Sequence, residues 1–364
     1  MVKPREILKK VEPYRPGKPI SEVQRELGLA DIHKLASNEN PLGPSPLAME
    51  AVREEISNLN FYPDAGCHAL RKKLGEKLGF PMERIVIGAG SEQLLHYLID
   101  AFVGQGDEIV MPWPSFSIYN INTSLREGVA VKISLTEDFR LDLPAMADAV
   151  TAKTKIVFVC NPNNPSGTIV RKQDLEAFIA RVPEDVLIVL DEAYIEYVDR
   201  SKAADSLRYL KEHENIIVLR TFSKAYGLAG LRVGYGIASP AVTEAIGKVK
   251  DSFNVHNLAQ AAAFAAIDDE VHLSKTIAAN NTAKAYICAE LDKMGLRYAE
   301  SETNFILFEI KADSGKVFEK LLRRGVIVRP GHLLGHPGFL RVSTGKPAEN
   351  ELFIKSLKEV LAEV

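Results

Sequence analysis

The sequence predicts an α/β protein in which a large, doubly wound, mostly parallel seven-stranded sheet domain is followed by a smaller α+β domain. Seven apolar runs lie between residues 85 and 238, and most are continuous rather than alternating, as expected for parallel strands covered on both faces. Helix-like segments such as 91–103 and 172–181 separate several of these runs, which is the pattern of crossover connections. The runs are Ile85–Ile87, Glu108–Met111, Val129–Ile133, Ile156–Val159, Val186–Leu190, Ile216–Leu219 and Val233–Ala238.

This pattern divides the chain into three predicted segments: an arm, a large domain and a small domain. Residues 1–35 are polar with scattered prolines and predict an arm with one short helix near 21–27, packed on the small domain or on a dimer partner. Residues 36–250 form the predicted large domain, and residues 251–364 the small one. The small domain is predicted to contain helices at 258–266, 273–294, 316–324 and 349–362, and strands at 305–310, 326–328 and 339–342.

Composition excludes several classes of function. Hydrophobic residues make up 46% of the 364 residues and charged residues 26%, which is ordinary for a soluble globular protein. The net charge is −3, whereas binding to nucleic acid would need a basic face, so the charge gives no support for a nucleic-acid partner. No apolar stretch approaches the roughly 18 residues of a membrane span. We therefore expect a cytoplasmic protein without nucleic-acid or membrane partners. The three cysteines, Cys67, Cys160 and Cys288, are far apart and predict no disulfide framework.

A glycine turn follows the first predicted strand. The sequence Gly88-Ala89-Gly90-Ser91-Glu92 leads into a helix, which we expect to be capped by the serine. Exposed amides and the helix dipole can hold a phosphate there, although many strand-to-helix turns look alike. The dinucleotide fingerprint fails because Gln93 occupies the third glycine position, and no GxxxxGK[ST] loop occurs. A single phosphate is therefore predicted rather than a nucleotide.

Polar groups also follow three later strands, at the sheet edge where ligands of such domains bind. Residues 161–167 read Asn-Pro-Asn-Asn-Pro-Ser-Gly, a stiff loop or a plain turn. Asp191 closes an apolar run, where a carboxylate either caps the next helix or faces a buried cation. Lys224 follows the run at 216–219, and Arg232 comes eight residues later. An isolated lysine there would be a surface residue, but a lysine beside an anion site suits a Schiff-base amine.

These residues together suit one cofactor, pyridoxal 5′-phosphate. It needs an amine, an acid at its ring nitrogen, a donor at its phenolic oxygen, a stacking ring and a phosphate cradle. The sequence supplies an amine in Lys224 and an acid in Asp191. The remaining candidates are Asn164 and Tyr194 for the phenolic oxygen, Phe116 for stacking, and Gly90, Ser91, Ser223 and Arg232 for the phosphate.

The chain resembles the fold-type I aminotransferases, and within them the histidinol-phosphate aminotransferase family. The resemblance extends over nearly the whole chain, and the Ser-Lys…Arg stretch with Asp-Glu-Ala-Tyr upstream is highly specific. The matching segments are Leu35–Pro41, Tyr62–Asp64, Asn161–Gly167, Asp191–Tyr194, Ser223–Arg232, Ser301–Phe305 and Phe339–Ser343. The resemblance implies ping-pong transamination between histidinol phosphate and 2-oxoglutarate, with glutamate as the returning donor, in histidine biosynthesis.

The resemblance also implies roles for residues. Lys224 would bind the cofactor as a Schiff base and act with Asp191 and Tyr194 as the catalytic group. Phe116 stands where many relatives have a tyrosine, so stacking is kept and the hydroxyl is lost. The other implied cofactor contacts are Asn164 at the phenolic oxygen and Gly90, Ser91, Glu92, Ser223 and Arg232 around the phosphate. Tyr62 would reach the cofactor phosphate of the neighbouring subunit, which implies a homodimer with shared active sites.

Substrate contacts are implied in the small domain and the arm. Arg341 would bind the α-carboxylate of glutamate and the phosphate of histidinol phosphate, assisted by Arg329. Tyr14 and Asn38 would line the mouth of the site. The loop 331–338 carries two histidines, but its Gly and Pro residues do not allow the helix of a zinc HExxH site, and a lid over the substrate is predicted instead.

Three other functions remain open at this point. An aromatic amino-acid aminotransferase would use the same cofactor residues. A threonine-phosphate decarboxylase, a lyase, resembles the family closely and needs no oxo-acid acceptor. A regulator with an aminotransferase-like domain would usually add a basic DNA-binding segment, and the N-terminal part of this sequence has none.

Overall fold

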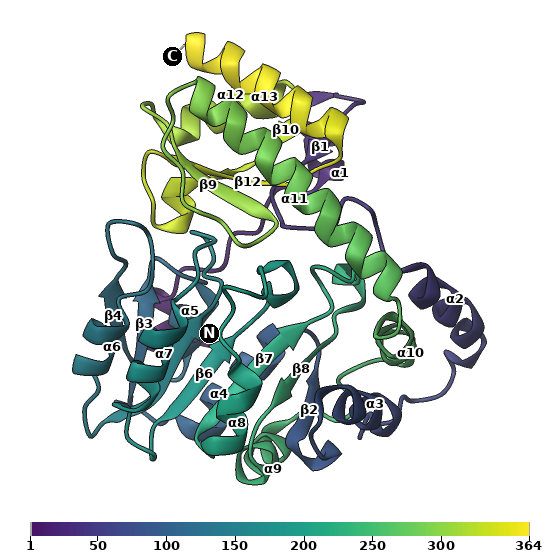
Figure 1. The fold of residues 1–364 in the computed structure, drawn as a ribbon, viewed down its shortest axis with the longest axis vertical. Coiled ribbons are helices and arrows are strands. Elements are labelled where there is room, and N and C mark those ends of the chain that lie inside the picture. The colour runs from purple at the N-terminus through teal and green to yellow at the C-terminus, as the bar shows by residue number, and fades with distance from the viewer. Residues whose placement is uncertain (1, 364) are drawn as a thin grey trace.

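The computed structural model describes residues 2–363 and has the predicted architecture (Figure 1). The large domain contains a seven-stranded sheet with the strand order β2-β8-β7-β6-β5-β3-β4. Its neighbouring strands are parallel except where β8 lies antiparallel to both β2 and β7. The strands are β2 (Ile85–Gly88), β3 (Glu108–Trp113), β4 (Val129–Ser134), β5 (Thr154–Cys160), β6 (Leu187–Asp191), β7 (Ile216–Thr221) and β8 (Gly234–Ile237).

The antiparallel β8 follows from its connection. Parallel neighbours need a long crossover, usually a helix. Residues 222–233 join β7 to β8 with only one short 3-10 turn, η5 (Ala229–Leu231), so the chain returns alongside β7 in the opposite direction. This connecting segment contains Lys224 and Arg232, which the return of the chain brings to one sheet edge.

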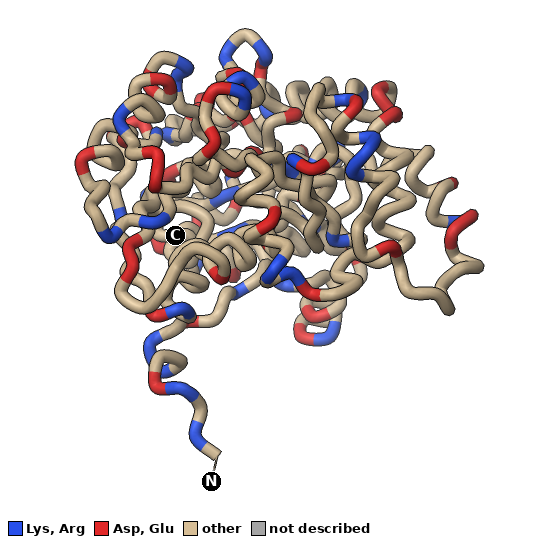
Figure 2. The backbone as a smooth tube through the Cα atoms, turned by 90° about the horizontal axis from the view of Figure 1, so that it is seen from below, with Lys and Arg blue, Asp and Glu red and all other residues tan. Residues whose placement is uncertain are grey.

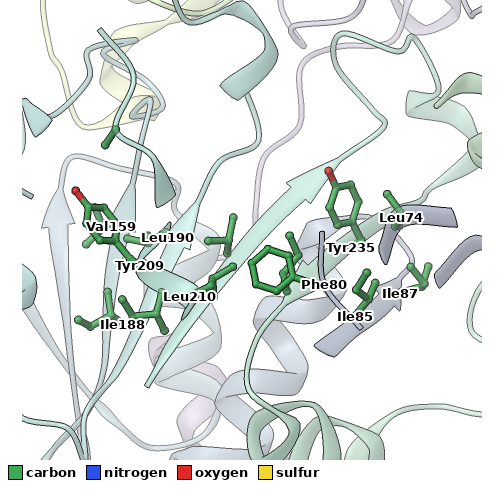
Figure 3. Close-up of a cluster of buried hydrophobic side chains, with 14 of the residues drawn as sticks. Leu74, Phe80, Ile85, Ile87, Val159, Ile188, Leu190, Tyr209, Leu210 and Tyr235 are labelled. Carbon is green, nitrogen blue, oxygen red and sulfur yellow. The ribbon is translucent and has the colours of Figure 1, made fainter. Parts of the chain in front are cut away.

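Helices cover both faces of the sheet and enclose two apolar cores. One core packs β-strand side chains against α4, α5 and α9; the other packs them against α3, α6, α7, α8 and α10. Figure 3 shows part of the second core, with Val159, Ile188 and Leu190 of the sheet near Tyr209 and Leu210 of α8. The helices are α2 (Pro46–Glu55), α3 (His68–Leu78), α4 (Ser91–Phe102), α5 (Ile118–Leu125), α6 (Leu143–Asp148), α7 (Lys172–Ile179), α8 (Ser206–Glu212), α9 (Pro240–Val249) and α10 (Asn257–Ala266).

Helix α10 follows residue 250, where the predicted boundary lies, but it packs in the large domain. Ala259, Ala262 and Ala263 are fully buried in the second core of the large domain, and α10 packs closely on α2. An alanine-rich helix allows this close approach because its side chains are small. The structure therefore groups residues 255–267 with the large domain, and the small domain begins within α11 (Glu270–Lys293), which extends from one domain to the other (Figure 1).

The small domain contains an antiparallel sheet with the order β11-β12-β9 and a parallel pair, β1 with β10. Its core includes Leu35, so the end of the predicted arm packs on this domain. The strands are β1 (His33–Lys34), β9 (Phe305–Glu309), β10 (Val326–Ile327), β11 (Arg329–Pro330) and β12 (Phe339–Ser343). The helices that accompany them are α1 (Ile20–Leu27), α12 (Ser314–Arg323) and α13 (Pro347–Ala362).

The first part of the arm extends away from the body of the protein (Figure 2). It contains the short 3-10 helix η1 (Glu6–Lys10), which was not predicted. Basic and acidic positions are interspersed along the backbone in this view. Among residues 2–363, no helix combines the length and the apolar character needed to cross a bilayer.

Candidate active site

The carboxyl ends of β5, β6 and β7 meet at a cavity of about 200 Å³ between the two domains. Every predicted site residue except Tyr62 lines this cavity, although these residues come from the arm, five strand ends and the small domain. They are Tyr14, Asn38, Gly90, Ser91, Glu92, Phe116, Asn164, Asp191, Tyr194, Ser223, Lys224, Arg232, Arg329 and Arg341. The structure thus brings the predicted residues together around one space.

Lys224 projects into this cavity from the segment that follows β7. Its Nζ donates a hydrogen bond of 3.2 Å to the carbonyl of Ser37 and has no carboxylate within ion-pair distance among the described residues. Burial, together with the positive charge of Arg341, lowers the pKa of Lys224 from its usual value to about 8. A much larger fraction of this amine than of an ordinary lysine is therefore neutral, and nucleophilic, near neutral pH.

Asp191, at the end of β6, is 4% exposed. Its Oδ2 accepts a 2.7 Å hydrogen bond from the hydroxyl of Tyr119, whereas its buried Oδ1 has no partner among the described residues. Burial raises the pKa of this carboxyl to about 6, against the opposing effect of the Tyr119 hydrogen bond. Asp191 caps no helix, so of the two interpretations the structure favours the buried cation. An unpartnered buried carboxylate oxygen fits the protonated ring nitrogen of pyridoxal phosphate.

The start of α4 lies at the cavity where the phosphate cradle is predicted, and the structure corrects one detail of that prediction. Gly90, at φ 78°, is the N-cap residue, and its position is not capped by a side chain, so the expected serine cap is wrong. Instead Gln93 accepts a 2.7 Å hydrogen bond from the amide of Ala89. Arg232 lies close to Gly90 and donates to Ser223 Oγ over 3.5 Å. The amides, hydroxyls and guanidinium provide the donors that a phosphate needs.

Asn164 and Tyr194 are held by residues that reach across the domain boundary. Arg341 Nη1 donates to Asn164 Oδ1 over 2.6 Å, which leaves the Asn164 amide nitrogen free to donate. Asn38 Nδ2 donates to the Tyr194 hydroxyl over 2.9 Å, and Ser343 donates in turn to Asn38 Oδ1. Burial raises the pKa of Tyr194 well above its usual range, so its hydroxyl keeps its proton.

Arg329 and Arg341 lie directly opposite each other on the antiparallel strands β11 and β12. They are 4% and 5% exposed, and neither forms an ion pair with a described carboxylate. Arg329 donates to the carbonyl of Arg15, and Arg341 to that of Ala36. Burial lowers the pKa of both guanidinium groups, that of Arg341 to about 10. Two buried, paired cations without an acidic partner are costly, and an anion of a ligand would offset that cost.

A second cavity of about 530 Å³ adjoins the first and shares Tyr14, Phe116, Arg329 and Arg341 with it. The arm residues 10–15 form one wall, and the short 3-10 helix η6 (Gly331–Leu334) forms another. The rings of Tyr14 and Phe116 meet edge to face with centroids 6.4 Å apart. The predicted lid segment thus lies at the mouth of the site.

Tyr62 lies outside both cavities and is 82% exposed. Its ring stacks on that of Phe253 with centroids 4.6 Å apart. Phe61, Leu59 and Ile56 nearby are also more than half exposed. The position is compatible with a contact to a second subunit, and the role predicted for Tyr62 stays a prediction.

The cavity also contains residues that sequence reasoning missed. Thr221 and Cys160 line it from the ends of β7 and β5, and Ser37 supplies the carbonyl that receives Lys224. Cys160, predicted as a buried apolar residue, is indeed 4% exposed. Its position at a strand end was the signal that could have found it. Tyr119 carried no such signal, because it lies within a helix.

Comparisons with known proteins agree with this geometry. The family model described as aminotransferase class I and II matches residues 30–357. Histidinol-phosphate aminotransferase of Moorella thermoacetica is 48% identical over 359 residues, covering 98% of this chain and 93% of the relative. Histidinol-phosphate aminotransferase 2 of Carboxydothermus hydrogenoformans is 46% identical, covering 98% and 99%.

A solved structure is also similar over its whole length. It is the histidinol-phosphate aminotransferase of Sinorhizobium meliloti in complex with pyridoxal-5′-phosphate, with a TM-score of 0.91 and 28% identity over 100% of this chain and 98% of that one. Family model, sequence relatives and fold all agree. The chain therefore belongs to the class I and II aminotransferase family.

Proposed function

We propose that this protein is a histidinol-phosphate transaminase that uses pyridoxal 5′-phosphate. The observation that carries the proposal is the buried pair Arg329 and Arg341, which has no carboxylate partner among the described residues and lines the same cavity as Lys224, whose pKa is lowered. The pair suits an anionic substrate group, and both phosphate and carboxylate offer oxygens with the required geometry. The two sequence relatives and the solved neighbour named above support this choice of substrate.

The residues present fit the cofactor. Lys224 would bind its aldehyde, Asp191 Oδ1 its ring nitrogen, and Asn164 with Tyr194 its phenolic oxygen. Phe116 would stack on the ring, and the donors around the start of α4 would hold the phosphate: Gly90, Ser91, Ser223 and Arg232, with Glu92 beside them. When bound, pyridoxal phosphate supplies an electron sink for the electrons of the substrate Cα–H bond.

The remaining work is done by the chain itself. Lys224 has a lowered pKa, so it can take the Cα proton of the substrate and later return a proton. Asp191, held by Tyr119, would keep the ring nitrogen protonated. Arg341 would orient the anionic end of each substrate in turn, which allows one site to serve both half-reactions. The arm and η6 at the cavity mouth would exclude water.

We also propose a homodimer in which Tyr62 of one subunit completes the phosphate site of the other. The high exposure of Tyr62 and its apolar neighbours supports this, because large apolar groups rarely gather on a free surface without a partner. A cytoplasmic location stays a prediction. Light scattering of the purified protein would test the dimer, and a monomer at micromolar concentration would contradict it.

An assay of the purified protein with pyridoxal phosphate tests the substrate. Histidinol phosphate, phenylalanine and threonine phosphate are each offered with 2-oxoglutarate. We expect kcat/KM for histidinol phosphate to exceed that for phenylalanine by at least about 100-fold, the scale on which one well-used charged contact discriminates. Preference for phenylalanine would indicate the aromatic aminotransferase, and release of carbon dioxide from threonine phosphate would indicate the decarboxylase.

A variant test separates the enzyme from a mere ligand binder. Lys224→Ala should lose far more than the 10²–10⁴-fold that a positioned acid–base group contributes, because it also loses the covalent attachment. Near-normal turnover in this variant would end the proposal.

A further inference from the structure

The hydroxyl of Tyr119 contacts the carboxylate of Asp191, which lines the cofactor cavity. It donates to Asp191 Oδ2 over 2.7 Å, although Tyr119 lies in α5 and Asp191 at the end of β6. The exposed fractions are 1% and 4%, so solvent cannot readily replace this donor. The other oxygen of Asp191 stays without a partner among the described residues. The hydrogen bond therefore determines which carboxylate oxygen is left available.

Aromatic contacts hold the Tyr119 ring in place. It stacks on Phe158 with centroids 4.3 Å apart and an interplanar angle of 8°. It meets Phe116 edge to face, with centroids 5.8 Å apart. Phe116 lines both cavities. One side chain thus touches both the proposed stacking ring and the proposed partner of the ring nitrogen.

We propose that Tyr119 is a positioning residue, whose hydroxyl keeps the Asp191 carboxylate ionised and turned with Oδ1 toward the protonated ring nitrogen of the cofactor. This inference rests on the proposed function. Tyr119 acts through Asp191 and does not itself touch the substrate. Its ring also fixes the edge against which Phe116 packs.

The protonation of Asp191 can be followed by varying the pH, because the titratable groups described next do not change charge in the same range. Burial raises the pKa of the Cys160 thiol on β5 to about 12, and it raises the pKa of Tyr119 and Tyr194 above their usual range. These three groups therefore stay neutral across the working range of pH. Glu192, next in the chain, forms an ion pair with Arg220 at 2.8 Å. The pKa of Asp191, already raised to about 6 by burial, would rise further without the Tyr119 hydrogen bond.

The test is the dissociation constant of pyridoxal phosphate, measured by equilibrium titration at pH 6.5 and pH 9 without substrate. It compares wild type, Tyr119→Phe and Tyr209→Phe. Tyr209 is a matched control, because it is 2% exposed, its hydroxyl has no partner among the described residues, and it lies in the second core (Figure 3). It does not line the cavity. Thermal unfolding of all three proteins reports any loss of stability.

For Tyr119→Phe we expect binding about tenfold weaker at pH 6.5 and nearly unchanged at pH 9, where Asp191 is ionised in both proteins. Tyr209→Phe should match wild type at both values. Equal weakening at both pH values, or none, would overturn the inference while leaving the proposed function intact. A wild-type protein that takes up no pyridoxal phosphate would overturn both.

Discussion

Arg341 Nη1 donates a 2.6 Å hydrogen bond to Asn164 Oδ1, and this contact joins the proposed substrate anchor to the proposed cofactor contact. Arg341 comes from β12 of the small domain, and Asn164 from the loop after β5 of the large domain. An anion that binds Arg341 would therefore lie one hydrogen bond away from the amide proposed to hold the cofactor. If both residues have the proposed roles, substrate binding and cofactor geometry are coupled at this point.

The first prediction concerns Arg341. Arg341→Lys keeps the charge but loses the planar fork that donates to Asn164 and to the carbonyl of Ala36. We expect kcat/KM to fall by about 10²-fold or more for both histidinol phosphate and glutamate, because one arginine is proposed to serve both half-reactions.

Arg84→Lys is the control, because it also replaces a largely buried guanidinium by an amine. Arg84 also donates to backbone carbonyls, those of Ala238 and Leu210, but it lies far from the cavity residues in the fold. Its kcat/KM should stay near the wild-type value. Loss for only one of the two substrates in Arg341→Lys would contradict a shared anchor.

The second prediction concerns the pH dependence of Lys224. Only the neutral amine attacks an aldehyde, so a lowered pKa moves its reactivity to lower pH. The rate at which the cofactor-free protein attaches pyridoxal phosphate should rise through about pH 8 and then level off. Arg341→Met should move this midpoint upward, because the charge of Arg341 contributes to the shift. A rate that still climbs near pH 10 in wild type would show an unshifted lysine.

The third prediction concerns close packing under the phosphate cradle. A Cβ at position 234 would lie 2.5 Å from the amide nitrogen of Ser91 and 2.8 Å from the carbonyl carbon of Gly90. Gly234→Ala must therefore displace the start of α4. We expect the affinity for pyridoxal phosphate to fall at least about tenfold, since the cradle relies on fixed backbone amides.

Gly247→Ala is the matched control, because position 247 lies in α9 and a Cβ there meets nothing within 4 Å. Alanine in a helix stabilises by about 0.5–1 kcal/mol relative to glycine, and cofactor affinity should not change. Equal cofactor affinity in the two variants would refute the packing argument.

The fourth prediction concerns Glu196, which is not part of the active site. Burial raises the pKa of its carboxyl from 4.5 to about 7, and its Oε2 has no partner among the described residues. The folded state therefore binds more protons than the unfolded state between about pH 4.5 and 7, and stability falls as pH rises through this window.

Glu196→Gln removes that pH-dependent loss. The quantity to compare is the unfolding free energy of the variant minus that of wild type. This difference should be about 1–3 kcal/mol larger at pH 8 than at pH 5. Urea unfolding at the two pH values measures this difference. Glu76→Gln, at an exposed position of α3, is the control and should show no such difference. A variant whose stability relative to wild type is the same at both pH values would refute a raised pKa.

Much of the site could be predicted because of how parallel strands lie in a sheet. Asp191, Asn164 and Lys224 each follow an apolar run, and the carboxyl ends of parallel strands meet at one edge, so their positions in the chain predicted their proximity. The glycine turn before α4 was recognised for the same reason, although the capping group was not, since Gln93 acts from within the helix.

Other features carried no local pattern. The sequence alone determined which elements form and which residues sit at strand ends, because apolar periodicity and turn chemistry are local properties. Only the tertiary structure decided that the Tyr119 hydroxyl meets Asp191, that Arg329 pairs with Arg341 across two strands, and that α10 packs in the large domain. These contacts depend on where helices and strands distant in the chain are placed by packing, and a hydrogen bond between residues 72 positions apart leaves no periodic trace in either segment.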